Sequence, residues 1–215
     1  MATLDFLPLL LQGLVVTLEI TAGAACVSLL MAFSAAFARL SEYRLVRFLA
    51  LMYIDLFRGT SALVQLFWAY FALPLIGVNL TAMSVAVTVL GLNIGAYGAE
   101  VVRSALQAIP RAQREAAQAL NFNPYQQMRY IILPQALRIM MPSFTNLLIE
   151  LLKTTSLVSL ITLSDLTFQA QVLRGATLRS AEIFGLTLLL YFAIARLIAM
   201  VMRRLEKSLN VGFNP

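Results

Sequence analysis

Long uncharged stretches alternate with polar ones along this chain, and their lengths predict where helices cross a bilayer. The 19 residues of Ile20–Ala38 carry no charge, which at 1.5 Å per residue is about enough to cross a hydrocarbon core of ~30 Å. The 41 uncharged residues of Gly59–Ala99 are enough for two crossings, with a turn at Pro74, Gly77 and Asn79. The predicted spans are about 13–38, 56–75, 80–102, 137–160 and 183–202.

The fourth apolar region, Ile139–Leu163, is not continuous. Glu150 and Lys153 interrupt it, and the hydroxyl residues 154–156 follow directly. We therefore expect a broken span here. A charged side chain near the bilayer centre costs about 2.5 to 3.5 kcal/mol, so Glu150 and Lys153 also require a compensating environment. Between this region and the last span, residues 164–181 mix charged and apolar side chains, which is typical of a loop with some helix.

The composition points to a membrane as the solvent. Hydrophobic residues make up 60% of the chain and charged residues 12%, against roughly 25% charged in an ordinary soluble domain. Twelve of the 16 Lys and Arg residues lie between spans one and two or at the start of span two, between spans three and four or at the start of span four, or in the C-terminal tail. Because cytoplasmic loops carry an excess of Lys and Arg, we predict an all-α integral membrane protein with about five transmembrane helices, N-terminus out and C-terminus in. The net charge of +6 then needs no nucleic acid to explain it.

The residues that are missing exclude several kinds of chemistry within this sequence. It contains no His, and its one Cys, Cys26, lies in an apolar run, so it offers no disulfide, no Cys/His zinc site and no His-based acid–base chemistry. It also has no phosphate loop of the form Gly-x-x-x-x-Gly-Lys-Ser/Thr. We expect no bound cofactor or metal, and a membrane-embedded enzyme is a poor alternative.

The longest polar stretch, Glu100–Arg138, predicts two short cytoplasmic helices joined by a turn. Good helix formers follow Pro110 as far as Leu120, and Asn121–Pro124 interrupts them. Asn123 and Gln126 have the spacing of a capping box. Such a hairpin suits docking into a groove on a partner protein, and it equally suits a helix resting on the bilayer surface.

The hairpin sequence resembles the EAA loop of ABC-importer permeases. That motif reads EAA, three residues, Gly, nine residues, I-x-LP, and here it is Glu115-Ala116-Ala117, three residues, Asn121, nine residues, Ile131-x-Leu133-Pro134. Short sequence segments over most of the chain are similar to the polar amino acid uptake family. They surround Arg58-Gly59-Thr60, Asn93-Ile94-Gly95 and Lys153-Thr154-Thr155. One residue of the loop motif departs, since Asn121 replaces Gly. We expect the turn to survive, because Asn tolerates the left-handed conformation.

The resemblance implies a type I ABC importer permease occupying 1–215 as a single transmembrane domain in the bacterial cell inner membrane. Its partners would be a dimer of ATPase subunits, which bind ATP and Mg, a periplasmic solute-binding protein, a second permease that is identical or related, and membrane lipid. The loop of about 103–136 would couple the spans to the ATPase. The residues implied in that coupling are Glu115, Ala116, Ala117, Leu120, Asn121 and Phe122.

The resemblance leaves the solute open. Ser61, where the family usually has Pro, Thr154, where it often has Asp, and Asn121 are most similar to the subgroup that imports ectoine and hydroxyectoine. A homodimeric permease for basic or other polar amino acids is the alternative, and a passive channel subunit without energy coupling is a third hypothesis.

Several polar residues within or beside the spans are candidates for the solute pathway. Glu150 and Lys153 either neutralise each other or, with Asn146 and Thr154, line the pathway and meet the charges of a zwitterion. Gln65 and Trp68 could offer an amide and an aromatic face to a cationic solute, although a packed Trp near the interface is the commoner arrangement. Glu19 either faces the same cavity or lies at the outer interface. The stripe Gly91, Gly95 and Ala99 suggests close helix packing.

Overall fold

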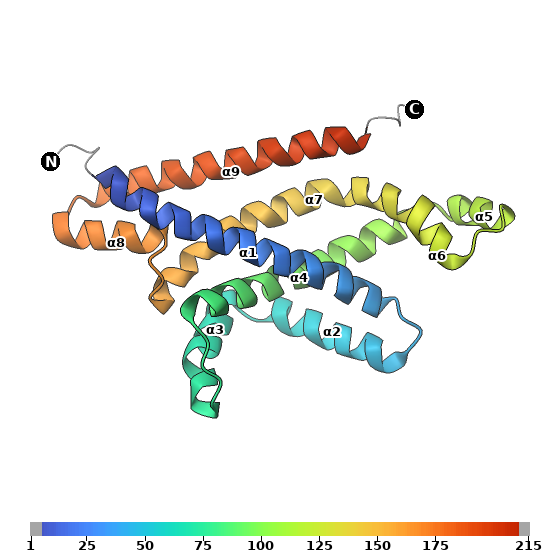
Figure 1. The fold of residues 1–215 in the computed structure, drawn as a ribbon, viewed down its shortest axis with the longest axis horizontal. Helices are drawn as coiled ribbons and strands as arrows, with labels where there is room; N and C mark the ends of the chain where they lie inside the picture. The colour runs from blue at the N-terminus through green and yellow to red at the C-terminus, as the bar shows by residue number, and fades with distance from the viewer. Residues whose placement is uncertain (1–5, 211–215) are drawn as a thin grey trace.

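The computed structural model describes residues 6–210, and every regular element in that part of the chain is helical (Figure 1). This confirms the predicted fold class. The elements are α1 (Leu7–Arg39), α2 (Arg44–Gly59), α3 (Ala62–Phe67), the π-helix η2 (Trp68–Ala72), the 3₁₀ helix η3 (Leu73–Ile76), α4 (Ala82–Gln107), α5 (Arg111–Ala119), α6 (Pro124–Gln126), the π-helix η4 (Gln127–Ile132), α7 (Leu133–Thr154), the 3₁₀ helix η5 (Thr155–Ile161), α8 (Leu166–Thr177) and α9 (Ser180–Asn210).

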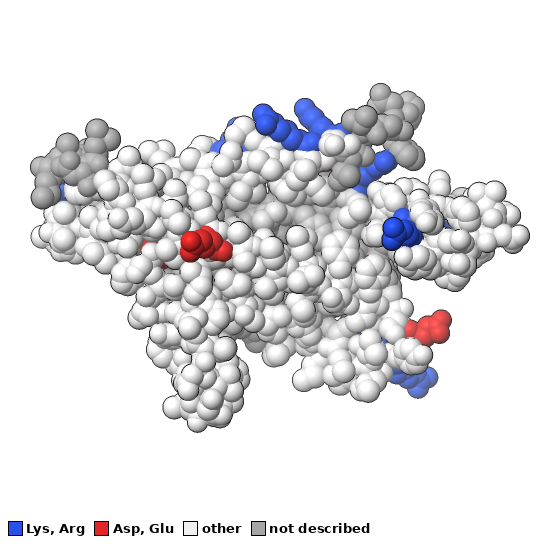
Figure 2. All heavy atoms as spheres, in the orientation of Figure 1, with Lys and Arg blue, Asp and Glu red and all other residues white. Residues whose placement is uncertain are grey.

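Four helical stretches of the described chain are long and apolar enough to cross a bilayer, and joining two further helices gives a bent fifth. The four are 7–39, 82–107, 124–161 and 180–208. The fifth consists of Arg44–Gly59 and Ala62–Ile76, which meet at 106°. Figure 2 shows Lys and Arg side chains over the C-terminal half of α9 and toward the end of the molecule that carries α5 and α6, while the middle of this face is nearly uncharged.

α1 and α4 pack together through small residues. A Cβ at Gly91 would lie 2.6 Å from Val27 Cβ, and a Cβ at Gly98 would lie 2.7 Å from Ala32 Cβ. Because real Cβ atoms essentially never approach another heavy atom that closely, only glycine fits at these positions. The stripe predicted from the sequence is therefore a helix-packing face, and Gly98 extends it.

The predicted second span, 56–75, is not one straight helix. It contains the break between α2 and α3 at residues 60–61, so its first four residues belong to α2 and the remainder turns away by 106°. Hydrogen bonds hold this bend. Gln65 Nε2 donates to Phe57 O at 3.0 Å and to Thr60 Oγ1 at 2.7 Å, and Asn93 Nδ2 on α4 donates to Phe57 O and to Gln65 Oε1, each at 3.0 Å.

The first turns of α1 are fixed by α8 and α9. Leu10 of α1, Leu166 of α8 and Ile183 of α9 form one fully buried apolar cluster. Thr17 Oγ1 accepts a hydrogen bond from Leu166 N at 3.1 Å, and a Cβ at Gly13 would lie 2.7 Å from Asp165 O. At 33 residues, or about 50 Å, α1 is longer than a ~30 Å hydrocarbon core, and this additional length provides the contact with α8.

Candidate functional site

The polar loop between α4 and α7 folds as a helical hairpin at the end of the molecule beyond the long helices (Figure 1). α5 ends at Ala119, and Asn121 then takes the left-handed conformation with φ 59°, as the sequence predicts. The turn is closed by Leu120 N donating to Ala116 O at 3.2 Å and Phe122 N donating to Ala117 O at 3.1 Å. Replacement of Gly by Asn in the motif therefore leaves the turn intact.

Hydrogen bonds also fix the second half of the hairpin and attach it to the spans. Asn123 and Gln126 form the predicted capping box, with Asn123 N donating to Gln126 Oε1 at 2.9 Å and Gln126 N donating to Asn123 Oδ1 at 2.8 Å. Arg114 Nη2 donates to Leu106 O, in the last turn of α4, at 3.0 Å. The hairpin is thus tied to the end of α4 and passes directly into α7.

The hairpin presents an exposed surface to any partner. Glu115 and Ala116 are exposed, and Leu120 is 68% exposed, whereas Ala117 is buried, with 1% of its surface exposed. Large side chains on the second half are also open, with Tyr125 at 67%. An exposed surface that combines apolar and charged groups is typical of a protein interaction site.

Polar side chains on α7 form one exposed stripe along the predicted fourth span. Asn146, Glu150 and Lys153 are spaced four and three residues apart, which places them on one helical face, and all three are exposed. Glu150 Oε2 and Lys153 Nζ lie 3.8 Å apart, so the predicted ion pair is present. The side chains of Glu150 and Lys153 are 60% and 65% exposed. The two residues can therefore neutralise each other and still line a pathway.

The hydroxyl residues after Lys153 close the end of α7. Thr154 Oγ1 donates to Glu150 O at 2.8 Å, Thr155 Oγ1 to Leu152 O at 2.7 Å and Ser156 Oγ to Lys153 O at 2.8 Å. The α-helix changes to a 3₁₀ helix at Thr155, where the sequence predicts an interruption. These hydroxyls stabilise the helix end by supplying donors to its carbonyl groups.

The remaining pathway candidates lie in two other places. The Gln65 amide is fully engaged in holding the bend between α2 and α3, which is a positioning role that the sequence does not reveal. Trp68 is 60% exposed beside it. Glu19 is exposed on α1 and makes no ion pair within residues 6–210.

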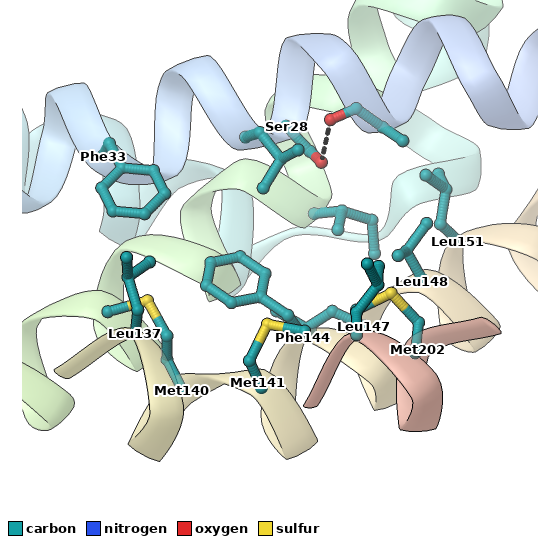
Figure 3. A pocket seen from close by; sticks show the side chains of 14 residues that line it. Ser28, Phe33, Leu137, Met140, Met141, Phe144, Leu147, Leu148, Leu151 and Met202 are labelled. Carbon is teal, nitrogen blue, oxygen red and sulfur yellow. Dashed lines mark hydrogen bonds between the residues drawn. The ribbon is translucent and has the colours of Figure 1, made fainter. Parts of the chain in front are cut away.

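Among the cavities formed by the described residues, two that adjoin the spans have apolar walls. One, of about 270 Å³, lies between α1, α7 and the end of α9, with Phe33, Phe144 and Met202 in its wall (Figure 3). No charged side chain is among its lining residues, and the Ser28 hydroxyl donates to Ala25 O at 2.9 Å, so this cavity offers no opposite charge to a zwitterion. The other, of about 530 Å³, lies beside the bend and is called here the lateral hollow; its wall includes Leu56, Val64, Gln65, Trp68, Leu80 and Thr88.

Sequence reasoning missed a cluster of charges at the inner ends of the helices. Glu100 pairs with Arg103 at 2.9 Å, as its spacing suggests, but it also pairs with Arg39 from α1 and lies 3.8 Å from Arg58 of α2. Arg58 also lies over the Tyr97 ring, 5.4 Å from its centroid. One carboxylate therefore links three helices, and no local pattern in the sequence indicates these contacts. Within the described residues, no cluster of His, Cys, Asp and Glu could hold a metal ion.

Comparison with known proteins assigns the class. The binding-protein-dependent transport system inner membrane components match residues 7–210. The chain belongs to this family. It is a permease subunit of an ABC transporter, a multi-pass component of the inner membrane and not an enzyme.

Individual relatives agree over nearly the whole chain. A probable amino-acid ABC transporter permease protein, y4tF of Sinorhizobium fredii, is 45% identical over 212 residues, which cover 96% of this chain and 89% of the relative. The glutamine transport system permease protein GlnP of Escherichia coli is 34% identical over 207 residues, covering 95% and 94%.

Solved structures show the same fold. The crystal structure of an amino acid ABC transporter with histidines superposes with a TM-score of 0.89 at 33% identity, over 95% of this chain and 96% of that chain. The MetNI methionine ABC transporter in an inward-facing conformation gives a TM-score of 0.81 at 21% identity, covering 97% and 99%, which shows the shared fold alone.

Proposed function

We propose that this chain is the permease half of an ATP-driven importer for a polar amino acid or a related zwitterionic solute. The observation that carries the proposal is the exposed hairpin of α5 and α6, which bears the EAA sequence at the cytoplasmic end of the molecule. A pair of ATPase subunits, with ATP and Mg bound to them, would dock on this hairpin. A periplasmic binding protein would deliver the solute, and a second permease would complete the pathway.

The hairpin is suited to a mechanical role. Its α5 end is held by Arg114 to the last turn of α4, and its other end continues through η4 into α7 without a loop. A displacement of the hairpin by the ATPase therefore reaches two spans at once. Glu115, Ala116, Ala117, Leu120, Asn121 and Phe122 make up the proposed docking surface and its turn.

The stripe on α7 supports the proposed pathway. Charged groups on a span cannot face lipid at low cost, so Asn146, Glu150 and Lys153 favour a water-filled passage on their side of α7. An opposite-charge pair 3.8 Å apart can exchange its internal contact for the ammonium and carboxylate of a zwitterion. Thr154 extends the polar stripe at its outer end, and Glu19, Gln65 and Trp68 are further candidates whose side chains lie elsewhere on the molecule.

Two solute classes follow from different observations. Relatives named for glutamine and arginine transport support a polar amino acid. Ser61, Thr154 and Asn121 resemble the ectoine and hydroxyectoine subgroup, which is the narrower alternative. Both classes carry a cationic and an anionic group.

The proposed function is tested by reconstituting the full complex in lipid nanodiscs. ATP turnover is measured with binding protein loaded with glutamine, arginine, histidine, glutamate, ectoine or hydroxyectoine. We expect stimulation by one class of solute. We expect Glu115→Lys and Ala117→Asp to abolish it, because a charge of the wrong sign or a carboxylate at a buried alanine disrupts docking.

Glu42→Lys is the matched control for the docking variants, because Glu42 is also an exposed cytoplasmic carboxylate but lies outside the hairpin. Normal solute-stimulated turnover in both hairpin variants would contradict the coupling role and favour a passive channel.

The pathway role is tested separately with Glu150→Gln. We expect slower uptake with the complex still assembled. Glu182→Gln, which removes a carboxylate from another i,i+3 ion pair on the outer side, is the control. Unchanged uptake kinetics in Glu150→Gln would leave that residue with a packing role only.

A further inference from the structure

The segment after the bend, α3 to η3 or Ala62–Ile76, is called here the arm. It leaves the body of the molecule at 106° to α2 and projects away from the long helices (Figure 1). Its large apolar side chains are open, with Leu75 86% exposed, Ile76 69%, Trp68 60% and Phe71 56%. In a membrane protein, open apolar side chains of this kind face either lipid or another subunit.

The arm has no polar face of its own. Between Ala62 and Ile76 the side chains with polar groups other than the indole of Trp68 are Gln65 and Tyr70. Gln65 is bonded to the bend, and the Tyr70 hydroxyl lies 3.4 Å from Thr162 Oγ1 at the end of η5. A helix lying at a membrane surface needs a strongly polar side toward water, whereas a helix that is apolar all round is surrounded by protein or by the hydrocarbon of a membrane. The arm matches the second description but is not covered within the described chain.

The root of the arm is packed against the body of the molecule. Leu66 is fully buried, Ala69 is 7% exposed, and both pack in one cluster with Val158 and Ile161 of η5. η5 directly follows the α7 helix that carries the polar stripe. The arm therefore extends from the outer end of the proposed pathway.

We propose that the arm packs on the second permease, with its tip, Leu75 and Ile76, in that subunit's lateral hollow. This inference rests on the proposed two-permease pathway. The chain carries both an apolar projection and, at its base, an apolar cavity of about 530 Å³, which is the self-complementary arrangement that a two-fold contact between like subunits requires. A second permease of the same fold provides the same cavity.

The apolar chemistry of the arm distinguishes this partner from the binding protein. Permanent subunit contacts are more hydrophobic than contacts that form and dissociate in each transport cycle. A binding protein must detach from the permease to collect solute. The arm tip carries no charged group that could guide its repeated association. Lipid is the other candidate neighbour, and the test separates it.

The test is photo-crosslinking in the complete complex in nanodiscs, with p-benzoylphenylalanine at position 75 or 76. Matched controls carry it in place of Leu188 or Phe192, which are 66% and 61% exposed on α9. We expect positions 75 and 76 to give adducts with the second permease that map to the walls of its hollow, the region corresponding to 56–92. We expect the α9 positions to give lipid adducts alone.

Adducts of positions 75 and 76 with lipid alone, with the binding protein, or with permease residues outside the hollow would overturn the arm proposal, as would the absence of any adduct at both positions. Solute-stimulated ATP turnover is measured on the same samples. Normal turnover without the expected adduct removes the arm contact and leaves the importer in place, whereas loss of solute stimulation in the unsubstituted complex contradicts the importer itself.

Discussion

The two ends of α1 are attached to the rest of the molecule by different chemistry. At the inner end, Arg39 joins Arg58 and Arg103 around Glu100, and all four side chains are 22–41% exposed. At the outer end, Gly13 and Thr17 contact the start of α8, where Asp165 is fully buried. Charge is used where water reaches the groups, and close backbone contact is used where it does not.

The outer contact also shows how a carboxylate can be buried without an ion pair. Asp165 caps α8, accepting from Thr167 N at 3.1 Å and Phe168 N at 2.9 Å. Burial raises the pKa of Asp165 from 3.8 to about 6, because removal from water disfavours the charged form, and the two backbone donors oppose this increase. The inner cluster stabilises charge with other charges, whereas the outer one stabilises it with peptide groups.

Glu100→Ala tests the inner attachment and is expected to have the largest effect. Three arginines then face one another without their shared carboxylate, so we expect a loss of roughly 2–3 kcal/mol in the free energy of unfolding. The measurement is the thermal unfolding midpoint of the purified complex. A midpoint equal to that of the unsubstituted complex would show that the cluster does not hold α1.

Gly13→Ala tests the outer attachment. Its new Cβ would lie 2.7 Å from Asp165 O, a backbone atom that cannot swing away, so α1 and α8 must separate. We expect a loss of about 1–3 kcal/mol, measured in the same way. Gly185→Ala is the control, because nothing lies within 4 Å of its added Cβ. Equal stability of the two variants would contradict the close contact.

Asp165→Ala and Asp165→Asn separate the cap from the charge. Ala removes the cap and should cost about 1 kcal/mol in the free energy of unfolding, whereas Asn keeps the cap.

The charge is tested through the pH dependence of stability. Because the pKa of Asp165 is higher in the folded state, the folded protein binds more protons than the unfolded one. The resulting contribution to stability is present below pH 3.8 and is lost as pH rises through about 6. Thermal midpoints measured across this range should therefore decline more in the unsubstituted protein than in the Asp165→Asn variant, whose amide does not titrate. Parallel pH profiles of the two proteins would argue against burial of the charge.

Arg58→Gln should have the smallest effect. Its guanidinium is 3.8 Å from Glu100 and its side chain is 41% exposed, so solvent screening leaves about 0.5 kcal/mol. We expect this difference in thermal midpoint to vanish at high salt. A larger loss that salt does not reduce would assign Arg58 a packing role over Tyr97 instead.

The sequence predicts those parts of the fold that depend on local composition. Span positions follow from the lengths of uncharged runs, and the turn at Asn121 and the capping box at Asn123 follow from residue types at fixed spacing. The pairing of Glu150 with Lys153 follows in the same way, because helical neighbours are defined by sequence distance alone.

Features that depend on direction in space are not predictable in this way. The bend at residues 60–61 lies at the start of an uncharged run, and an apolar pattern does not indicate whether a helix continues straight or turns. Its stabilising bond from Asn93 to Gln65 joins residues 28 apart. The pairing of Arg39 with Glu100 likewise requires that α1 and α4 already be packed together.

The glycine contacts between α1 and α4 also restrict motion. Side chains of α1 pack directly against glycines of α4, in the pairs Val27–Gly91, Met31–Gly95 and Ala32–Gly98. A shift of one helix along its axis by one residue would therefore bring Cβ atoms into collision. The pair can tilt together but cannot move as a piston. Spin labels placed on these two helices should keep one separation throughout a transport cycle, which makes them a fixed reference frame for measuring movement elsewhere in the complex.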